Sequence, residues 1–187
     1  GRFYALALSQ NGVRLLQGTR YTVAEVALED APRNLAEAIG PVERERQLQY
    51  HTRSSGQGGR GAAIFHGQSE PTALVKHDLT QFFRQVDKEL CELLRSERAP
   101  VVLAGVDYLR PLYQQISKYP HIVKEGVIGN PDDLPAKELH ARAWAIVEPI
   151  FLKAQRDAAE TYRERAGSER ASNRIEEIAP AAYQGRV

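Results

Sequence analysis

The dipeptide Asn11-Gly12 separates two short apolar runs, at residues 3–10 and 13–18. Asn-Gly is the strongest short signal for a two-residue turn, because both residues tolerate the positive φ angles that such a turn needs. The pattern therefore predicts an opening β-hairpin with its turn at Asn11-Gly12. A third apolar run, at residues 21–28, is expected to pair antiparallel beside this hairpin.

Helical and strand-like patterns then alternate along the chain. Apolar residues at three- and four-residue spacing predict a long helix over residues 72–98. The apolar run 101–105 is typical of a strand covered on both faces, and it is followed by a helical pattern at 108–118 and a weaker strand at 121–127. Together these elements predict an α/β fold of the ribonuclease-H-like type, with a mixed five-stranded sheet and flanking helices.

Shorter elements have recognisable ends. Asp30-Ala-Pro32 predicts the start of a short helix that Gly40 ends. A helical stripe that runs from Leu139 toward Arg165 contains Pro149, where we expect a kink or a break. Asn173 predicts the cap of a last short helix, which Gly185 ends.

The predicted elements divide the chain into two parts. Residues 1–151 should form one domain, in which Trp144 packs the last long helix onto the sheet. Residues 152–187 contain too little apolar sequence for a domain of their own, and we expect them to be the helical start of a truncated further domain. The chain has no methionine, including at position 1, so we expect it to be a piece of a longer protein.

Composition narrows the function classes. A net charge of +1 excludes the global basic field of a dedicated nucleic-acid binder, so any such role must be local. The chain contains no run of about 18 apolar residues, which a membrane-spanning helix would need. The single cysteine, Cys91, cannot form an internal disulfide and fits a reducing compartment, so we expect a cytoplasmic protein in which this thiol is a small buried hydrophobe.

A glycine-rich segment, residues 47–66, interrupts the strand and helix patterns. Its glycines are Gly56, Gly58, Gly59 and Gly61. Glycine allows backbone conformations closed to other residues and lets the main chain approach a ligand closely. No acidic residue occurs over the 24 positions between Glu45 and Glu70, which favours RNA phosphate contact by Arg53 and Arg60. The alternative is a flexible hairpin end with solvated arginines.

Other residues near this segment have simpler interpretations than ligand binding. His51 and His66 lack a third nearby metal ligand, so we expect no metal site there. Tyr50 and Phe65 could stack on bases, although packing against each other is the more economical interpretation.

Enzymatic motifs are scarce. A ribonuclease-H-type nuclease needs several carboxylates on the sheet, but the run Phe3–Leu8 contains none. Asp107 is well placed for such a site and is expected to cap the helix that follows it. The sequence contains no phosphate-binding loop, nucleophile elbow or cysteine and histidine cluster, so no cofactor is expected.

Several blocks resemble bacterial proteins related to the archaeo-eukaryotic peptide-chain release factors. They are Phe3–Gly18, Leu48–Thr52, Phe82–Asp87, Val102–Val106 and Gly129–Asp133. The likeness covers nearly the whole chain and is to the middle domain of the release factor and Pelota group. By this resemblance, residues from 152 onward would begin a third domain similar to a ribosomal protein.

The same resemblance gives the glycine-rich segment a role. In release factors the corresponding loop carries Gly-Gly-Gln and helps a water molecule attack the peptidyl-tRNA ester. Here the order is Gly56-Gln57-Gly58-Gly59-Arg60-Gly61, with glutamine before the glycine pair. The resemblance therefore implies ribosome or tRNA association more firmly than peptide release.

Three functional hypotheses remain. The leading one is a non-enzymatic, translation-associated factor that contacts RNA through Arg53 and residues 56–61. The first alternative is a peptidyl-tRNA hydrolase that uses Gln57 as its catalytic residue. The second is a protein-interaction module that has kept the fold without RNA contact.

Overall fold

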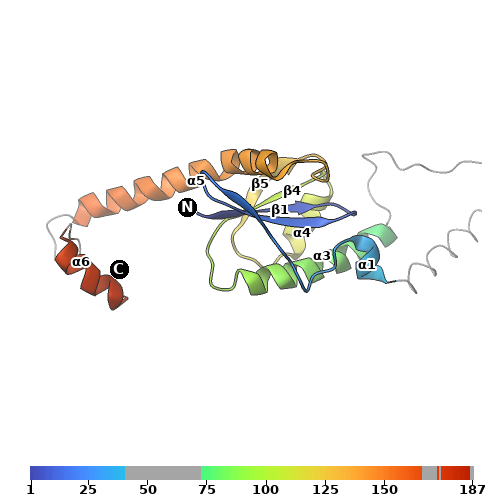
Figure 1. The fold of residues 1–187 in the computed structure, drawn as a ribbon, viewed down its shortest axis with the longest axis horizontal. Coiled ribbons are helices and arrows are strands. Elements are labelled where there is room, and N and C mark those ends of the chain that lie inside the picture. The colour runs from blue at the N-terminus through green and yellow to red at the C-terminus, as the bar shows by residue number, and fades with distance from the viewer. Residues whose placement is uncertain (41–72, 166–171, 173, 186–187) are drawn as a thin grey trace, which may run out of the picture. The chain divides into compact units, whose positions relative to one another are not determined.

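The computed structural model describes residues 1–40, 73–165, 172 and 174–185 (Figure 1). It divides into two compact units, Gly1–Val147 and Glu148–Val187. The first unit contains a mixed five-stranded sheet with helices packed on it. The predicted fold class is therefore confirmed.

The sheet is built from five strands within the described residues. They are β1 (Phe3–Leu8), β2 (Val13–Gly18), β3 (Val23–Val26), β4 (Val101–Gly105) and β5 (Ile122–Ile128). Their spatial order is β3-β2-β1-β4-β5. Strand β2 runs antiparallel to β1 and β3, while β4 and β5 run parallel to β1. The first three strands thus form the expected meander, and the parallel half is added beyond β1.

The described helices follow the predicted order, with different ends. They are α1 (Leu35–Ile39), α3 (Ala73–Leu93), α4 (Leu109–Ile116), α5 (Ala136–Arg165) and α6 (Ile175–Tyr183). Helix α5 continues through Pro149 to Arg165, so the helix does not break there, and the alternative of a kink at Pro149 stays a prediction. Proline removes the hydrogen bond to the carbonyl of Ala145. Because both residues are exposed, water can solvate that carbonyl and the helix need not end.

Helices α1 and α6 begin at other residues than the predicted ones. Helix α1 begins after Asn34, whose side chain accepts the N–H of Glu37 at 2.9 Å, instead of at the predicted Asp30-Ala-Pro32. It ends at Gly40 with φ 76°, as predicted. Helix α6 has Arg174 as its N-cap, without a side-chain cap bond, and Asn173, the predicted cap, lies outside the described residues.

One face of the sheet carries large side chains and packs on α3 and α4. Alternate residues of β1, Tyr4, Leu6 and Leu8, belong to this core. The stripe predicted for α3 is buried except for Leu93, which is 43% exposed at the helix end. The ring centroids of Phe83 and Tyr113 lie 5.5 Å apart and join α3 to α4.

The other face carries small residues beside the first part of α5. Ala5 and Ala7 of β1 are buried there, and Leu139 and Ala143 of α5 are fully buried. The ring of Phe3 lies 5.5 Å from His140 and 5.9 Å from Trp144, measured between centroids. Trp144 therefore packs α5 onto the sheet, as predicted.

The second unit, Glu148–Val187, contains the remainder of α5 and α6. Several of its large apolar side chains are exposed, including Ile150, Leu152, Tyr162 and Tyr183. The division into compact units falls near the predicted boundary at residue 151, and the assignment of residues 152–187 to a truncated further domain stays a prediction. Of the helices described, none combines the length and the apolar character needed to cross a membrane.

Candidate functional site

The parallel strands end together at one edge of the sheet. Strands β1, β4 and β5 end at Leu8, Gly105 and Ile128. In open α/β sheets, ligands commonly bind outside this carboxyl edge, because the loops that follow the strands surround a crevice there. Among the described residues, these loops hold the candidate site.

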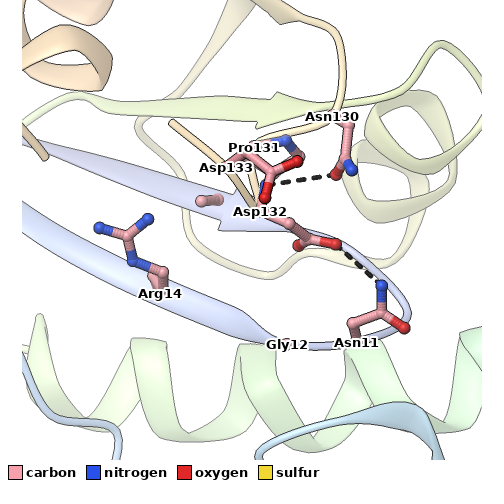
Figure 2. Close-up of a pocket in the computed structure, with 8 residues that line it drawn as sticks. Asn11, Gly12, Arg14, Asn130, Pro131, Asp132 and Asp133 are labelled. Atoms are coloured by element: carbon pink, nitrogen blue, oxygen red, sulfur yellow. Dashed lines mark hydrogen bonds between the residues drawn. The ribbon is translucent and has the colours of Figure 1, made fainter. Parts of the chain in front are cut away.

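A depression of about 530 Å³ lies at this edge. Figure 2 shows Asn11, Gly12 and Arg14 from the β1–β2 hairpin on one side, and residues 130–133 from the loop after β5 on the other. Ala7 completes the lining. Two segments far apart in sequence therefore form one polar surface.

The hairpin turn that presents Asn11 differs from the prediction. Leu8 pairs with Val13, and the Ser9 N–H donates to the Gly12 carbonyl at 3.0 Å, so Gln10 and Asn11 occupy the centre of the turn. The φ angle of Gly12 lies outside the left-handed region. The hairpin is confirmed, but the turn at Asn11-Gly12 is wrong by one residue.

The hydroxyl of Ser9 explains this shift. Ser9 Oγ accepts the N–H groups of Asn11 at 3.1 Å and Gly12 at 2.9 Å. These bonds give both loop N–H groups a side-chain acceptor, which favours the turn centred on Gln10 and Asn11. Ser9 is 6% exposed, so the turn is anchored in the protein interior.

The loop after β5 is held by hydrogen bonds within the loop, to the end of β4 and to the hairpin. Gly129 begins it with φ 119°, and its N–H donates to the Gly105 carbonyl at 3.2 Å. Asn130 Oδ1 accepts the N–H of Asp132 at 3.2 Å. Across the depression, Asn11 Nδ2 donates to Asp132 Oδ2 at 2.9 Å (Figure 2). The two sides of the site are thus held together directly.

The charges of the depression do not favour an anion. Arg14 Nη1 donates to the Leu134 carbonyl at 3.0 Å, and its Nε lies 3.3 Å from Glu25 Oε1. The guanidinium is therefore already paired, whereas Asp133 is exposed in the lining beside Asp132. This surface suits neutral hydrogen-bonding groups or a cation better than a phosphate.

Among the described residues, the carboxylates of this edge are not grouped as a two-metal nuclease site requires. Over the described residues, no group of three or more histidine, cysteine or acidic side chains is arranged to hold a metal ion. Asp107 does not cap α4 as predicted, because the N-cap is Tyr108 and has no side-chain cap bond. Instead, Asp107 Oδ1 lies 3.4 Å from Arg110 Nη2, one turn into the helix.

A buried carboxylate elsewhere in the unit, Asp87, is 3% exposed and has a structural arrangement. It accepts hydrogen bonds from Tyr113 Oη at 3.2 Å, Ser117 Oγ at 2.5 Å and the Lys118 N–H at 2.8 Å. Burial, followed by the Asp87 charge, holds the pKa of Tyr113 well above its ordinary value of 10.0. These contacts join α3 to the end of α4. In the sequence, the indication of this buried site was an acidic residue, Asp87, on the apolar stripe of α3.

Cys91 lies one turn beyond Asp87 and is half-buried. Its Sγ donates to Asp87 Oδ2 at 3.8 Å. Burial and then the neighbouring carboxylate raise the pKa of the thiol above 9.0, which keeps it protonated and poorly nucleophilic. The environment fits the packing role expected for this residue.

The RNA-contact residues predicted from sequence lie outside the described residues. They are Arg53, Gly56, Gln57, Gly58, Gly59, Arg60 and Gly61. The same is true of His51 and His66 and of Tyr50 and Phe65. The described chain ends before them at Gly40 and resumes at Ala73.

Helix α1, which ends next to Gly40, is attached to the hairpin that lines the depression. The first N–H of α1, from Leu35, donates to the Gln10 carbonyl at 3.1 Å.

Comparisons with known proteins identify a family. The model of the family described as bacterial archaeo-eukaryotic release factor family 3 matches residues 2–186. A search of the curated proteins finds no match. A solved structure described as an archaeal protein has 12% sequence identity and a TM-score of 0.44. The alignment covers 98% of this chain and 46% of the archaeal chain, so this chain spans about half the length of that protein.

Proposed function

The chain belongs to the bacterial archaeo-eukaryotic release factor family 3, and on this basis we propose that it is a ribosome- or tRNA-associated factor that does not catalyse peptide release. The observation that carries the proposal is the family match over residues 2–186, nearly the whole chain. A release-factor-like family implies a role in translation, and ribosomal RNA or tRNA supplies the partner.

The proposed contact element is the glycine-rich segment. Arg53 and Arg60 would neutralise RNA phosphates, while the glycines from Gly56 to Gly61 let the main chain approach the sugar-phosphate backbone closely. No acidic side chain between Glu45 and Glu70 opposes such contact. The hydrogen bond between Leu35 and Gln10 supports a firm attachment for this segment, because it fastens α1, the element before it, to the sheet edge.

The order of residues in the segment supports a non-catalytic role. A catalytic glutamine must be held where the attacking water and the ester meet, and small displacements greatly reduce rate. Gln57 precedes Gly58-Gly59, whereas the release-factor motif has its glutamine after two glycines. The main chain that would position Gln57 therefore differs from the arrangement that the chemistry uses.

Ribosome sedimentation at increasing salt tests the association. The chain should sediment with ribosomes at low salt and be released as salt rises, because phosphate contacts displace bound counterions. Arg53→Ala combined with Arg60→Ala should reduce the slope of log affinity against log salt by about 1.5. Arg95→Ala combined with Arg98→Ala, two exposed arginines near the end of α3, is the matched control. Failure of the unmodified chain to sediment in a salt-sensitive way would overturn the proposal.

Hydrolysis of peptidyl-tRNA remains the second candidate, because Gln57 lies beside a glycine pair in the matching segment. Release of a labelled peptide from stalled ribosomes separates the two functions. Release that is lost in Gln57→Ala would establish the enzyme and overturn the non-catalytic assignment. Equal release by both proteins would remove Gln57 from consideration.

A further inference from the structure

The turn between β2 and β3 is held by hydrogen bonds at Thr19. The Thr19 N–H donates to the Thr22 carbonyl at 2.9 Å, and Thr19 Oγ1 accepts the N–H groups of Tyr21 at 3.3 Å and Thr22 at 3.2 Å. The two threonine hydroxyl oxygens lie 2.7 Å apart. The Thr19 carbonyl accepts a hydrogen bond from His140 Nε2 at 2.7 Å, which attaches the turn to α5. The two residues at its tip are therefore presented by a fixed backbone.

Those two residues are Arg20 and Tyr21, and both are exposed. Tyr21 is 83% exposed, and Arg20 Cζ lies 5.5 Å from the centroid of its ring, within the range of a cation–π contact. None of the ion pairs found among the described residues involves Arg20. Glu25, the next acidic residue along the chain, is paired with Arg14. The guanidinium therefore lies beside an accessible ring, and no carboxylate of the described residues pairs with it.

The wider charge pattern also favours an anionic partner. Residues 1–24 contain three arginines and no acidic residue. Of these arginines, Arg2 is paired with Glu97 and Arg14 with Glu25. Arg20 is the arginine of this stretch that no described carboxylate neutralises. A partner that offers both a planar ring and a negative charge would satisfy both side chains of the tip.

From this geometry we propose that the Thr19–Thr22 turn is a contact site for unpaired nucleotides of RNA. A base stacks on the free face of the Tyr21 ring, and the guanidinium of Arg20 binds an adjacent phosphate. Because the turn is already ordered, little conformational entropy is lost on binding. The inference deepens the proposed association with ribosomes or tRNA. It assigns a second contact beside the start of β1, at the edge of the sheet opposite the depression.

The test measures binding of the chain Gly1–Val187 to a fluorescein-labelled single-stranded RNA of mixed sequence by fluorescence anisotropy. Tyr21→Ala should weaken binding about tenfold, whereas Tyr21→Phe, which keeps the ring, should bind like the unmodified chain. Arg20→Ala should reduce the slope of log affinity against log salt by about 0.7. Arg95→Ala serves as the matched control for loss of one exposed arginine.

An abasic oligonucleotide with the same sugar-phosphate backbone distinguishes stacking from charge. The effect of Tyr21→Ala should vanish on this probe, and the effect of Arg20→Ala should persist. Equal losses on both probes would overturn the stacking contact. Affinities equal to that of Arg95→Ala for both tip variants would overturn the site and would leave protein recognition as the use of this tip. Thermal unfolding followed by circular dichroism checks that all the variants fold.

Sedimentation with ribosomes, measured in parallel, separates this inference from the proposed function. If the unmodified chain sediments but the Arg20 and Tyr21 variants bind RNA normally, the tip assignment fails and the ribosome association stands. If the chain does not sediment while Tyr21→Ala still loses base-dependent RNA binding, the association fails and the tip remains an RNA contact.

Discussion

The phenol of Tyr113 donates a hydrogen bond to Asp87 Oδ1 across 3.2 Å, in the interior between α3 and α4. The same carboxylate accepts the Ser117 hydroxyl and the Lys118 main-chain N–H. A buried charge is tolerated only when its oxygens are satisfied, and here the donors come from the helix whose end must be positioned. The Asp87 cluster, formed by Asp87, Tyr113, Ser117 and Lys118, therefore fixes how α4 ends against α3.

Replacing the central carboxylate tests the stabilising role of the Asp87 cluster. Asp87→Ala should lower the free energy of unfolding by about 3 kcal/mol, because it leaves the Tyr113, Ser117 and Lys118 donors, and the weaker Cys91 thiol donor, without their acceptor. Urea unfolding measures the change. Asp133→Ala, at an exposed aspartate, should change the same quantity by less than about 0.5 kcal/mol. Similar losses in the two variants would contradict the structural role.

The Asp87 cluster also predicts alkaline sensitivity. The pKa of Tyr113 is raised well above 10.0 in the folded protein, so the folded state keeps the phenol proton to higher pH than the unfolded chain. The protonated Tyr113 phenol therefore contributes its full stabilisation below about pH 10. This stabilisation is lost as the pH rises from about 10 through the raised pKa of Tyr113 in the folded protein. Urea unfolding from about pH 8 to about pH 11 should show this decline, and Tyr113→Phe should show a shallower one. Identical pH profiles would refute the assignment to Tyr113.

Gly18 provides a test of how α5 docks on the sheet. A Cβ at this position would lie 2.7 Å from ring atoms of Phe3 and 2.9 Å from His140 Cδ2. Gly18→Ala should therefore displace these rings and lower the free energy of unfolding by about 1–3 kcal/mol. Trp144 is the single tryptophan and contacts Phe3, so its fluorescence should change with the displacement. An unchanged emission spectrum with unchanged stability would mean that the rings are not so closely packed around Gly18.

Gly12 tests the register of the hairpin turn, and Gly129, in the loop after β5, provides the comparison with a glycine of positive φ. The φ angle of Gly12 lies outside the left-handed region, and an added Cβ would meet only the Arg33 carbonyl, at 3.7 Å. Gly12→Ala should therefore be neutral or stabilising by up to about 1 kcal/mol. Gly129 has φ 119°, so Gly129→Ala should lower the free energy of unfolding by about 1 kcal/mol or more. Comparable destabilisation in Gly12→Ala would instead support the two-residue turn expected from Asn11-Gly12.

Much of the candidate site could not be predicted from the sequence, because it depends on which side chains meet in the folded protein. The pattern of apolar residues predicts the β1–β2 hairpin and the strand at residues 121–127 separately, but the hydrogen bond between Asn11 and Asp132 joins residues 121 positions apart. Asp107 follows a strand and precedes a helix, as a capping residue does, yet its carboxylate pairs with Arg110. The side-chain partners of Asn11 and Asp107 determine what these residues do, and the spacing of residues along the chain does not reveal those partners.

The amino-acid sequence by itself determined the kinds of element, the fold class and the family. The spacing of apolar residues suffices to predict α3 and β4. A helix packed on a sheet buries one apolar stripe, and a central strand buries both of its faces. The tertiary structure decided what depends on contacts between distant residues. Ser9 shifts the hairpin turn by satisfying loop N–H groups, and Asp87 occupies a core position because α4 supplies its donors. Local periodicity reports which face of an element is apolar, whereas hydrogen-bond partners exist only after the elements have packed together.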